Sequence, residues 1–490
     1  MSAQEWLLSV AAIAPEIGLL LLTVVVIFID RAVRPTERRN LGLIAAWGSF
    51  AVLLLTAGLW LFFNIPAQDP QLFWGGMVNN DLMTFVFRLM FLIAVMLTAL
   101  ISADVPSLQR SEYYALLFSA TIGFSLMAAG SDLIMLYLAL ETASISLYVL
   151  ANFQKGVYRS SEAGVKYFIY GAFASAVMLY GLSWLYGMTG QTNIYLVARA
   201  VLQQPDAAVL LAGALALVGF GFKISVVPYH FWAPDVYEGA PAPVSGLVST
   251  ASKAAGFALL LRVIMAGVFG TAEAASDWWS VLVAMCIVTM TLGNLLAIQQ
   301  TNVKRLLAYS SIAQAGYALM GLVTLSVDGS AATMYYLLYY VLTNIAAFGV
   351  VMLFSMVTGT EELKDMSGLS RRSPWLALVM LFALLSLGGI PPTAGFFGKF
   401  FIFRAAVEAG LWWLAAIGIL NALIALYYYL SVAKYMYLYR SPEDSVPIPV
   451  PRAAWVALGL TTFGILYLGL VAQPALQLAR NAALALFVGS

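Results

Sequence analysis

Apolar runs long enough to cross a membrane recur along the whole chain. About fourteen of them have roughly 20 residues or more, the length that an α-helix needs to cross about 30 Å of hydrocarbon. The predicted spans are 6–29, 41–64, 80–101, 111–130, 132–152, 163–188, 206–238, 240–267, 277–299, 304–326, 330–357, 373–409, 411–439 and 453–472. This pattern predicts an all-α polytopic membrane protein.

Two of these runs, 206–238 and 373–409, are too long for one straight span. Each has proline near its middle: Pro228 in the first, and Pro391 and Pro392 in the second. Proline removes a helical hydrogen bond and breaks the helix. Unpaired backbone is tolerated at membrane depth only where protein or water covers it. We therefore expect two broken helices, each lining an interior cavity.

The composition agrees with this class of protein and narrows its chemistry. Of 490 residues, 62% are hydrophobic and only 10% are charged, against about 25% charged in soluble domains. The net charge of +1 gives no indication of a nucleic-acid partner. The single Cys286 excludes an internal disulfide and a thiolate metal site. We predict no metal or cofactor in this chain.

Lysine and arginine in the loops predict the orientation. The loops after the first, fifth, ninth, eleventh and thirteenth spans carry most of them: Arg31, Arg34, Arg38, Arg39, Lys155, Arg159, Lys304, Arg305, Lys364, Arg371, Arg372, Arg440 and Arg452. The opposite loops hold little beyond Arg199, Arg262 and Arg404. Loops after odd-numbered spans are therefore predicted to be cytoplasmic, with both termini on the other side.

A weak internal repeat is also visible. The sixth span (KYFIYGAFASAVMLYG) resembles the eleventh (MYYLLYYVLTNIAAFG), and a broken helix follows each. An offset of five spans makes the second unit cross the membrane in the opposite sense, as in transporters with inverted repeats. The predicted divisions are an N-terminal three-helix segment (1–110), two five-helix repeats (111–267 and 277–439), and a fourteenth helix with a short tail (440–490).

Four ionisable residues are predicted near the middle of the membrane: Glu141, Lys223, Lys253 and Lys399. On insertion scales a lysine there costs roughly 2.5–3.5 kcal/mol, so the four together cost roughly 10 kcal/mol. Stability alone would not select that arrangement. A structural interpretation stays open for each: Glu141 could form an ion pair with one lysine, and carbonyls could satisfy Lys253 and Lys399.

Four further groups lie inside apolar runs. Lys166 is predicted one turn inside the sixth span, where its long side chain can reach outward. His230, the only histidine, is predicted near the cytoplasmic end of the seventh span, as a relay or as a hydrogen-bonded packing residue. For Arg88 and Glu16 we favour a structural role, since neither has an obvious partner in the sequence.

The functional interpretation of the central charges is proton transfer. Burial disfavours the protonated form of a lysine, and a nearby carboxylate favours it again. Glu141 beside Lys223 would be such a pair, with Lys253 and His230 as relays. Lys399 would exchange protons with the opposite side. No arrangement for covalent chemistry is present.

At these residues the chain resembles the antiporter-like N subunit of respiratory complex I, the NADH–quinone oxidoreductase. The resemblance is carried by PYHFWAPDVYEGAPAPVSGLVSTASKAAGFA at 228–258, NVKRLLAYSSIAQAGY at 302–317 and GGIPPTAGFFGKF at 388–400. It implies fourteen helices with two inverted repeats. It also implies that the family's central residues are Glu141, Lys223, Lys253 and Lys399, with Lys166 and His230 as further matches.

The same resemblance implies a proton-translocating subunit of a larger enzyme in the bacterial inner membrane. NADH, FMN, iron–sulfur clusters and quinone would belong to partner subunits. The M-type antiporter-like subunit, small membrane subunits and the lipid bilayer would be its neighbours. Lys399 favours the N subunit, because the M subunit usually has Glu there. The end of the chain at Ser490 is unlike the L subunit, which continues with a lateral helix.

One departure and two competing functions remain. Many members of the family have His where Gln314 stands, so the relay here would depend more on water. The alternative function is a subunit of a multi-subunit Na⁺/H⁺ antiporter or of a membrane-bound hydrogenase, although PDVYEGAP at 234–241 favours complex I. A purely structural membrane scaffold is the third possibility, against which the four buried charges argue.

Overall fold

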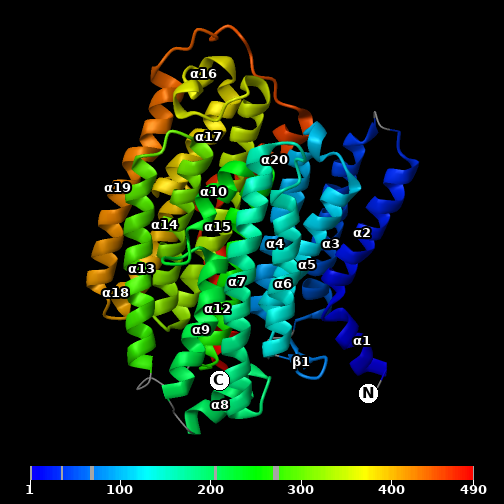
Figure 1. Cartoon of the computed structure of the whole chain (residues 1–490), viewed down its shortest axis with the longest axis vertical. Coiled ribbons are helices and arrows are strands. Elements are labelled where there is room, and N and C mark those ends of the chain that lie inside the picture. The colour runs from blue at the N-terminus through cyan, green and yellow to red at the C-terminus, as the bar shows by residue number, and fades with distance from the viewer. Residues whose placement is uncertain (1–2, 35–36, 67–70, 204–206, 269–274, 489–490) are drawn as a thin grey trace.

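Long helices running between two ends of the molecule dominate the fold (Figure 1). The structure is a computed structural model that describes residues 3–34, 37–66, 71–203, 207–268 and 275–488. In these ranges eleven helices are long and apolar enough to cross a membrane, or twelve if the bent pair α1–α2 counts as one span. The prediction of an all-helical polytopic membrane protein is confirmed.

The first part of the chain contains most of the short elements. They are α1 (Ala3–Ala11), α2 (Ala14–Ala32), α3 (Arg39–Phe63), β1 (Gln71–Phe73), β2 (Val78–Asn80), α4 (Leu82–Ser102), a 3₁₀ turn (Pro106–Leu108), α5 (Ser111–Ala129), α6 (Leu133–Ala151), α7 (Tyr158–Thr189), α8 (Ile194–Gln203), α9 (Ala207–Ile224), α10 (Trp232–Gly239), α11 (Ala242–Leu247), a π-helical turn (Val248–Ser252) and α12 (Lys253–Met265). The strands form one antiparallel hairpin, with Gln71 opposite Asn80.

The second part is helical apart from its connections. It comprises α13 (Ala275–Ile298), α14 (Val303–Val323), α15 (Val327–Thr358), a 3₁₀ turn (Leu363–Met366), α16 (Leu369–Arg372), α17 (Pro374–Gly388), α18 (Ala394–Glu408), α19 (Trp412–Leu438), α20 (Arg452–Leu470) and α21 (Gln473–Val488). Each predicted apolar run coincides with one or two of the helices. The predicted start of the seventh run, at 206, lies outside the described residues.

Polar residues at the helix ends fix where the long helices begin. Asp81 accepts a hydrogen bond from Thr84 N at 2.8 Å and caps α4. Asn302 accepts from Arg305 N at 3.1 Å and caps α14. Ser326 does the same for α15. Such caps satisfy amide groups that have no partner within the helix. The beginnings of the helices that surround the site are therefore set locally.

Both predicted breaks are present. Residues 225–231 separate α9 from α10, and residues 389–393 separate α17 from α18. The prolines named from the sequence lie inside these two breaks. A third irregularity, the π-helical turn before Lys253, was not predicted. There the hydroxyl of Thr250 bonds back to Gly246 O at 2.7 Å, an arrangement known to disturb helices.

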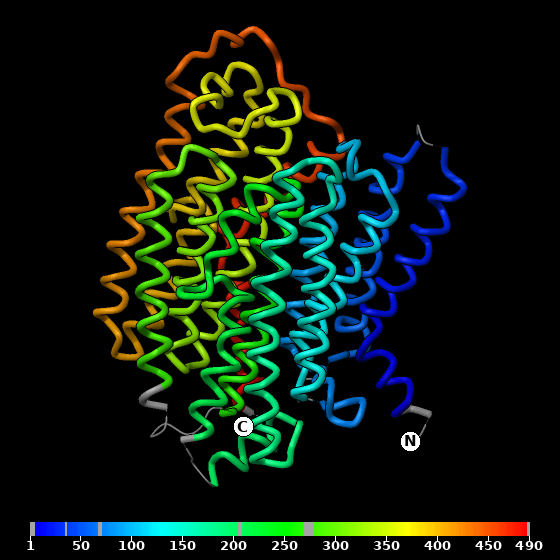
Figure 2. The backbone as a smooth tube through the Cα atoms, in the orientation of Figure 1, coloured from blue at the N-terminus to red at the C-terminus, as the bar shows by residue number. Residues whose placement is uncertain are grey.

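Two predictions need correction, one about the C-terminal tail and one about two arginines. The tail after the fourteenth predicted span is not a short appendage, because Gln473–Val488 forms α21 and packs against α15 and α4. Arg262 and Arg404 are not loop residues: the first lies in α12 and is 1% exposed, and the second lies in α18. The described ends of the chain lie at the same end of the molecule, and the segment after α19 lies at the opposite end (Figure 2).

Candidate functional site

Lys223 occupies the last turn of α9, directly before the first break, as predicted. Its side chain is 2% exposed. Its Nζ donates a hydrogen bond to Ser144 Oγ on α6 at 2.9 Å and lies 5.8 Å from the centre of the Phe124 ring. A neutral hydroxyl and an aromatic face thus surround this ammonium group.

Glu141 lies on α6, three residues before Ser144 and on the same face of that helix. Its side chain is partly exposed, but its Oε1 is buried and has no hydrogen-bond partner among the described residues. The ion pairs of the described residues do not include Glu141. Glu141 and Lys223 are therefore both next to Ser144, and the ion pair that a structural role of Glu141 would require is not among those of the described residues.

Lys253 lies at the start of α12, immediately after the π-helical turn, and is 1% exposed. Its Nζ donates to the backbone carbonyl and to the hydroxyl of Ser311, both at 2.6 Å. Ser311 belongs to α14, which comes from the second half of the chain. The contact therefore joins the two halves at a buried lysine.

Lys399 lies in α18, after the second break, and is 5% exposed. Its Nζ donates to the carbonyls of Leu387 and Gly388 at 2.9 and 3.0 Å. These carbonyls end α17, where the broken helix leaves them free to accept. The amide of Gln314 donates to the same Leu387 carbonyl at 3.1 Å. The residue that departs from the family pattern is thus in contact with the group that holds Lys399.

Helix α14 connects Lys253 to Lys399. Ser311 accepts from Lys253, and Gln314, one turn further along the same helix, shares the Leu387 carbonyl with Lys399. Tyrosines complete this connection: Tyr429 is within 3.0 Å of the Gln314 amide, and the Tyr336 hydroxyl donates to Gln314 Oε1. Neither Tyr429 nor Tyr336 was predicted individually from the sequence. Their signal was the run of Tyr residues in the eleventh and thirteenth spans, which is unusual for apolar helices.

Several buried polar atoms near the lysines have no hydrogen-bond partner in the described parts of the chain. They are Glu141 Oε1, Tyr148 Oη, Ser225 Oγ, His230 Nδ1, Tyr237 Oη, Ser252 Oγ, Tyr339 Oη and Asn344 Oδ1. Buried polar groups are normally satisfied by protein or by ordered water. These atoms add polar groups to the buried surroundings of the three lysines.

His230 and Lys166 lie in different parts of the structure. His230 is 3% exposed and lies within the first break, before α10 begins. Lys166 is two turns inside α7 and binds Asp235 at 2.6 Å and Glu162 at 2.7 Å. Lys166 therefore belongs to a separate group of charges.

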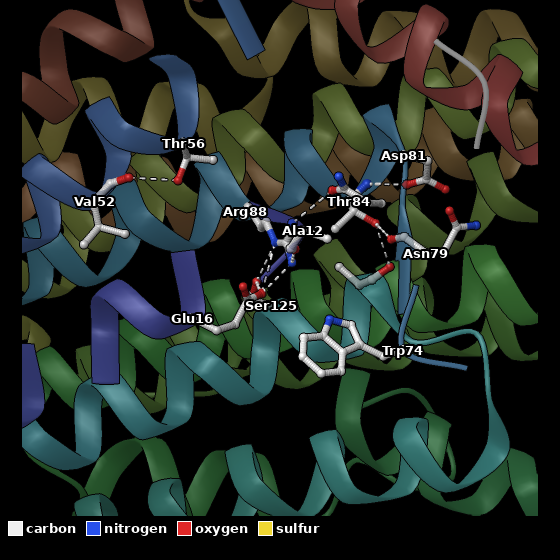
Figure 3. A network of polar contacts seen from close by, with 12 residues as sticks. Ala12, Glu16, Val52, Thr56, Trp74, Asn79, Asp81, Thr84, Arg88 and Ser125 are labelled. Carbon is white, nitrogen blue, oxygen red and sulfur yellow. Dashed lines mark hydrogen bonds and ion pairs between the residues drawn. The ribbon is translucent and has the colours of Figure 1, made fainter. Parts of the chain in front are cut away.

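A second set of buried charges forms two ion pairs beside helix α4, and Figure 3 shows the first of them, Arg88 with Glu16. Arg88 binds Glu16 at 2.7 Å, and the two side chains are 4% and 7% exposed. Arg262 binds both carboxylate oxygens of Asp81, at 2.8 and 3.0 Å. Arg88 and Glu16, which have no obvious partner in the sequence, are partners of each other. Their hydrogen bonds link α2, α4 and α5, as a structural role requires.

The family described as "NADH:quinone oxidoreductase/Mrp antiporter, TM" matches residues 130–425 of the chain. NADH-quinone oxidoreductase subunit N of Moorella thermoacetica is 43% identical over 487 residues, which cover 98% of this chain and 99% of the relative. The chain belongs to this family. Subunit 2 of the NAD(P)H-quinone oxidoreductase of Nostoc punctiforme is 38% identical and covers 97% of this chain and 90% of its own.

Solved structures of similar chains have the same fold. A chain of respiratory complex I from Thermus thermophilus with bound aureothin has a TM-score of 0.78 at 33% identity, over 94% of this chain and 98% of that chain. A chain of the Mrp complex from Dietzia has a TM-score of 0.85 at 21% identity, over 98% of both chains. The second likeness concerns the fold alone. The resemblance to the antiporter-like N subunits is confirmed.

Proposed function

We propose that this chain is the N-type proton-translocating subunit of a bacterial NADH:quinone oxidoreductase. The observation that carries the proposal is the row of Lys223, Lys253 and Lys399, the central lysines. Each is at most 5% exposed, and neutral oxygen atoms accept its hydrogen bonds. A buried cation without a carboxylate partner is costly, and an amine removes that cost when it gives up its proton.

In this proposal each central residue has one role. Glu141 adjusts the charge state of Lys223 through the shared Ser144 neighbourhood. Protons pass from Lys223 to Lys253 through water bound at the unpaired polar atoms, with His230 at the break as a relay. Ser311 and Gln314 then connect Lys253 to Lys399, which exchanges with the other side. Lys166 belongs to the entrance and not to the central row.

The fold supports two inverted repeats, which we propose comprise spans four to eight and nine to thirteen of fourteen. Helices α7 and α15 both have 32 residues and end at a glycine with left-handed backbone, Gly190 and Gly359. The cap of α6 pairs with Asn193 after α7, and the cap of α14 pairs with Glu362 after α15. The first pairing adjoins the β-hairpin and the second adjoins α16, at opposite ends of the molecule (Figure 1).

The proposed setting is the bacterial inner membrane, with the loops after α13, α15 and α19 in the cytoplasm and both termini on the other side. Other membrane-arm subunits, including the M-type subunit, would be the neighbours. NADH, FMN, iron–sulfur clusters and quinone would be bound by partner subunits. The names of the full-length relatives favour this setting over a Na⁺/H⁺ antiporter or a hydrogenase.

Lys223→Ala tests the proposed function. The ammonium group is lost, so proton transfer in vesicles that contain the reconstituted complex should fall by about tenfold or more. The complex should still assemble, because Lys223 makes one side-chain hydrogen bond and no ion pair in the described structure. Parental proton transfer in an assembled Lys223→Ala complex would refute the proposed function.

A further inference from the structure

A second group of charges surrounds the short helix α10, outside the central row. Asp235 accepts from Lys166 Nζ at 2.6 Å and from Arg305 Nη1 at 2.7 Å. Arg305 Nη1 also donates to Glu238 at 3.0 Å. Lys166 lies on α7 and Arg305 on α14, and α10 packs against both helices. One carboxylate of α10 is therefore shared between cations from the two halves of the chain.

These charges line a cavity at the end of α10. It has a volume of about 210 Å³ and is lined by Arg159, Glu162, Lys166, Asp235, Glu238 and Arg305. The side chains of Arg305 and Asp235 are 30% and 33% exposed. Ion pairs that keep this much contact with solvent contribute modestly to stability. They can therefore break and re-form without unfolding the helices that carry them.

The other end of α10 reaches the break beside Lys223. Trp232, its first residue, is 2% exposed and stacks on Tyr167, with ring centres 4.3 Å apart. Its Nε1 donates to Phe222 O at 3.2 Å, and Phe222 directly precedes Lys223. A helix of eight residues is about 12 Å long and moves as one piece. A shift of the charged end of α10 would therefore displace Phe222 and change the position of Lys223.

We propose that Arg305 is a positioning residue for proton uptake. By holding Asp235 and Glu238 it fixes α10 over the break, and transfer of Asp235 from Arg305 to Lys166 alone frees α10 to open the entrance to Lys223. The part of this inference that concerns proton uptake rests on the proposed function. The part that concerns the position of α10 does not.

The position of α10 is measured by thiol labelling, because the chain has one cysteine. Cys286 is fully buried and is replaced in a Cys286→Ser background. Ala233 on α10 is also fully buried, and Ala233→Cys makes it the reporter. In the assembled complex an impermeant maleimide is added from the proposed cytoplasmic side. Adding Arg305→Gln should raise the labelling rate of this chain about fivefold. The reason is that the substitution removes a partly exposed ion pair, whose loss shifts the opening of α10 by about that factor.

Two further variants make the result specific. Arg159 lines the same cavity but lies 3.9 Å from Glu238 and is 71% exposed, so Arg159→Gln should leave labelling unchanged. Arg305→Lys keeps the charge but loses the planar guanidinium group, which fixes the directions of the hydrogen bonds, and should label at an intermediate rate. If Arg305→Gln fails to assemble, Arg305→Lys and Asp235→Asn decide in its place, and both should label faster than the background.

Labelling in Arg305→Gln and Asp235→Asn that equals the background overturns the inference, as does equal acceleration in Arg159→Gln. Proton transfer separates this inference from the proposed function. If Arg305→Gln labels faster but transfers protons at the parental rate, the proposed role of Arg305 in proton uptake is overturned. Unchanged transfer in Lys223→Ala, by contrast, refutes the proposed function and leaves the labelling result standing.

Discussion

The buried charges around helix α4 form ion pairs, Arg88 with Glu16 and Arg262 with Asp81, whereas the central lysines have neutral partners. Arg262 and Asp81 are both 1% exposed and share two hydrogen bonds. Lys253 is equally buried, but its ammonium group contacts the carbonyl and hydroxyl of Ser311. A paired charge keeps its proton state and ties helices together. A charge with neutral partners can change its proton state without breaking an ion pair.

This comparison shows that burial alone does not identify a charged residue that takes part in proton transfer in a membrane protein. The paired set and the central lysines lie in helices of similar apolar character. What differs is the identity of the partner, and therefore the cost of losing it. Removing one member of a buried pair leaves an uncompensated charge. Removing a central lysine leaves only neutral oxygen atoms behind.

Arg262→Met should have the largest effect on stability. It leaves Asp81 charged, buried and unpaired, which costs about 3–5 kcal/mol. Thermal unfolding of the purified complex and the yield of assembled complex measure the loss. Adding Asp81→Asn should recover part of it, since the charge is gone and Asn still caps α4. If Arg262→Met unfolds like the parent, the pair does not tie these helices together.

Lys399→Ala should retain the fold and lose proton transfer, by about tenfold or more. Lys399→Glu keeps a group that can carry a proton at the end of α17 and should retain more activity than the alanine variant. Proton transfer in reconstituted vesicles compares the two. Equal or higher transfer in Lys399→Ala would remove Lys399 from the path and place the exit elsewhere.

Glu141 should give the smallest of these effects, because it acts on Lys223 through its charge. Glu141→Gln removes the charge and should slow coupled turnover several-fold, which is about 1 kcal/mol in the barrier. Glu141→Asp keeps the charge and should be milder. Turnover and proton transfer of the two variants are compared in the same membranes. Equal effects would indicate a steric role for Glu141.

Most of the fold could be predicted from the sequence, because apolar length and proline position follow directly from membrane physics. The two breaks at Pro228 and at Pro391–Pro392 are the clearest cases. The π-helical turn before Lys253 and the helix α21 were not predicted. The first depends on hydroxyl contacts within the helix, and the second on packing against α15. The first gives no periodic pattern in the sequence, and the second, with 16 residues, is shorter than a membrane span.

The residues of the site could be predicted from the sequence, but the contacts that join them could not. Lys223, Lys253 and Lys399 stood out because charges are rare in apolar runs. The contacts that join them, from Lys253 to Ser311 and from Gln314 to Leu387 O, lie between helices distant in sequence. Arg262 was placed in a loop because its partner, Asp81, is 181 residues away. Pairing across such distances requires the structure.

The most direct test of the difference between paired and unpaired charges is Lys253→Met. Methionine has a similar length and no charge, and the substitution removes the cost of burying a charge that has no ion-pair partner. Thermal unfolding and proton transfer of the assembled complex are measured together. We expect an unfolding midpoint equal to or above that of the parent, with proton transfer reduced about tenfold or more. A complex that transfers protons at the parental rate, or that loses transfer only in proportion to lost assembly, would show that Lys253 is a packing residue.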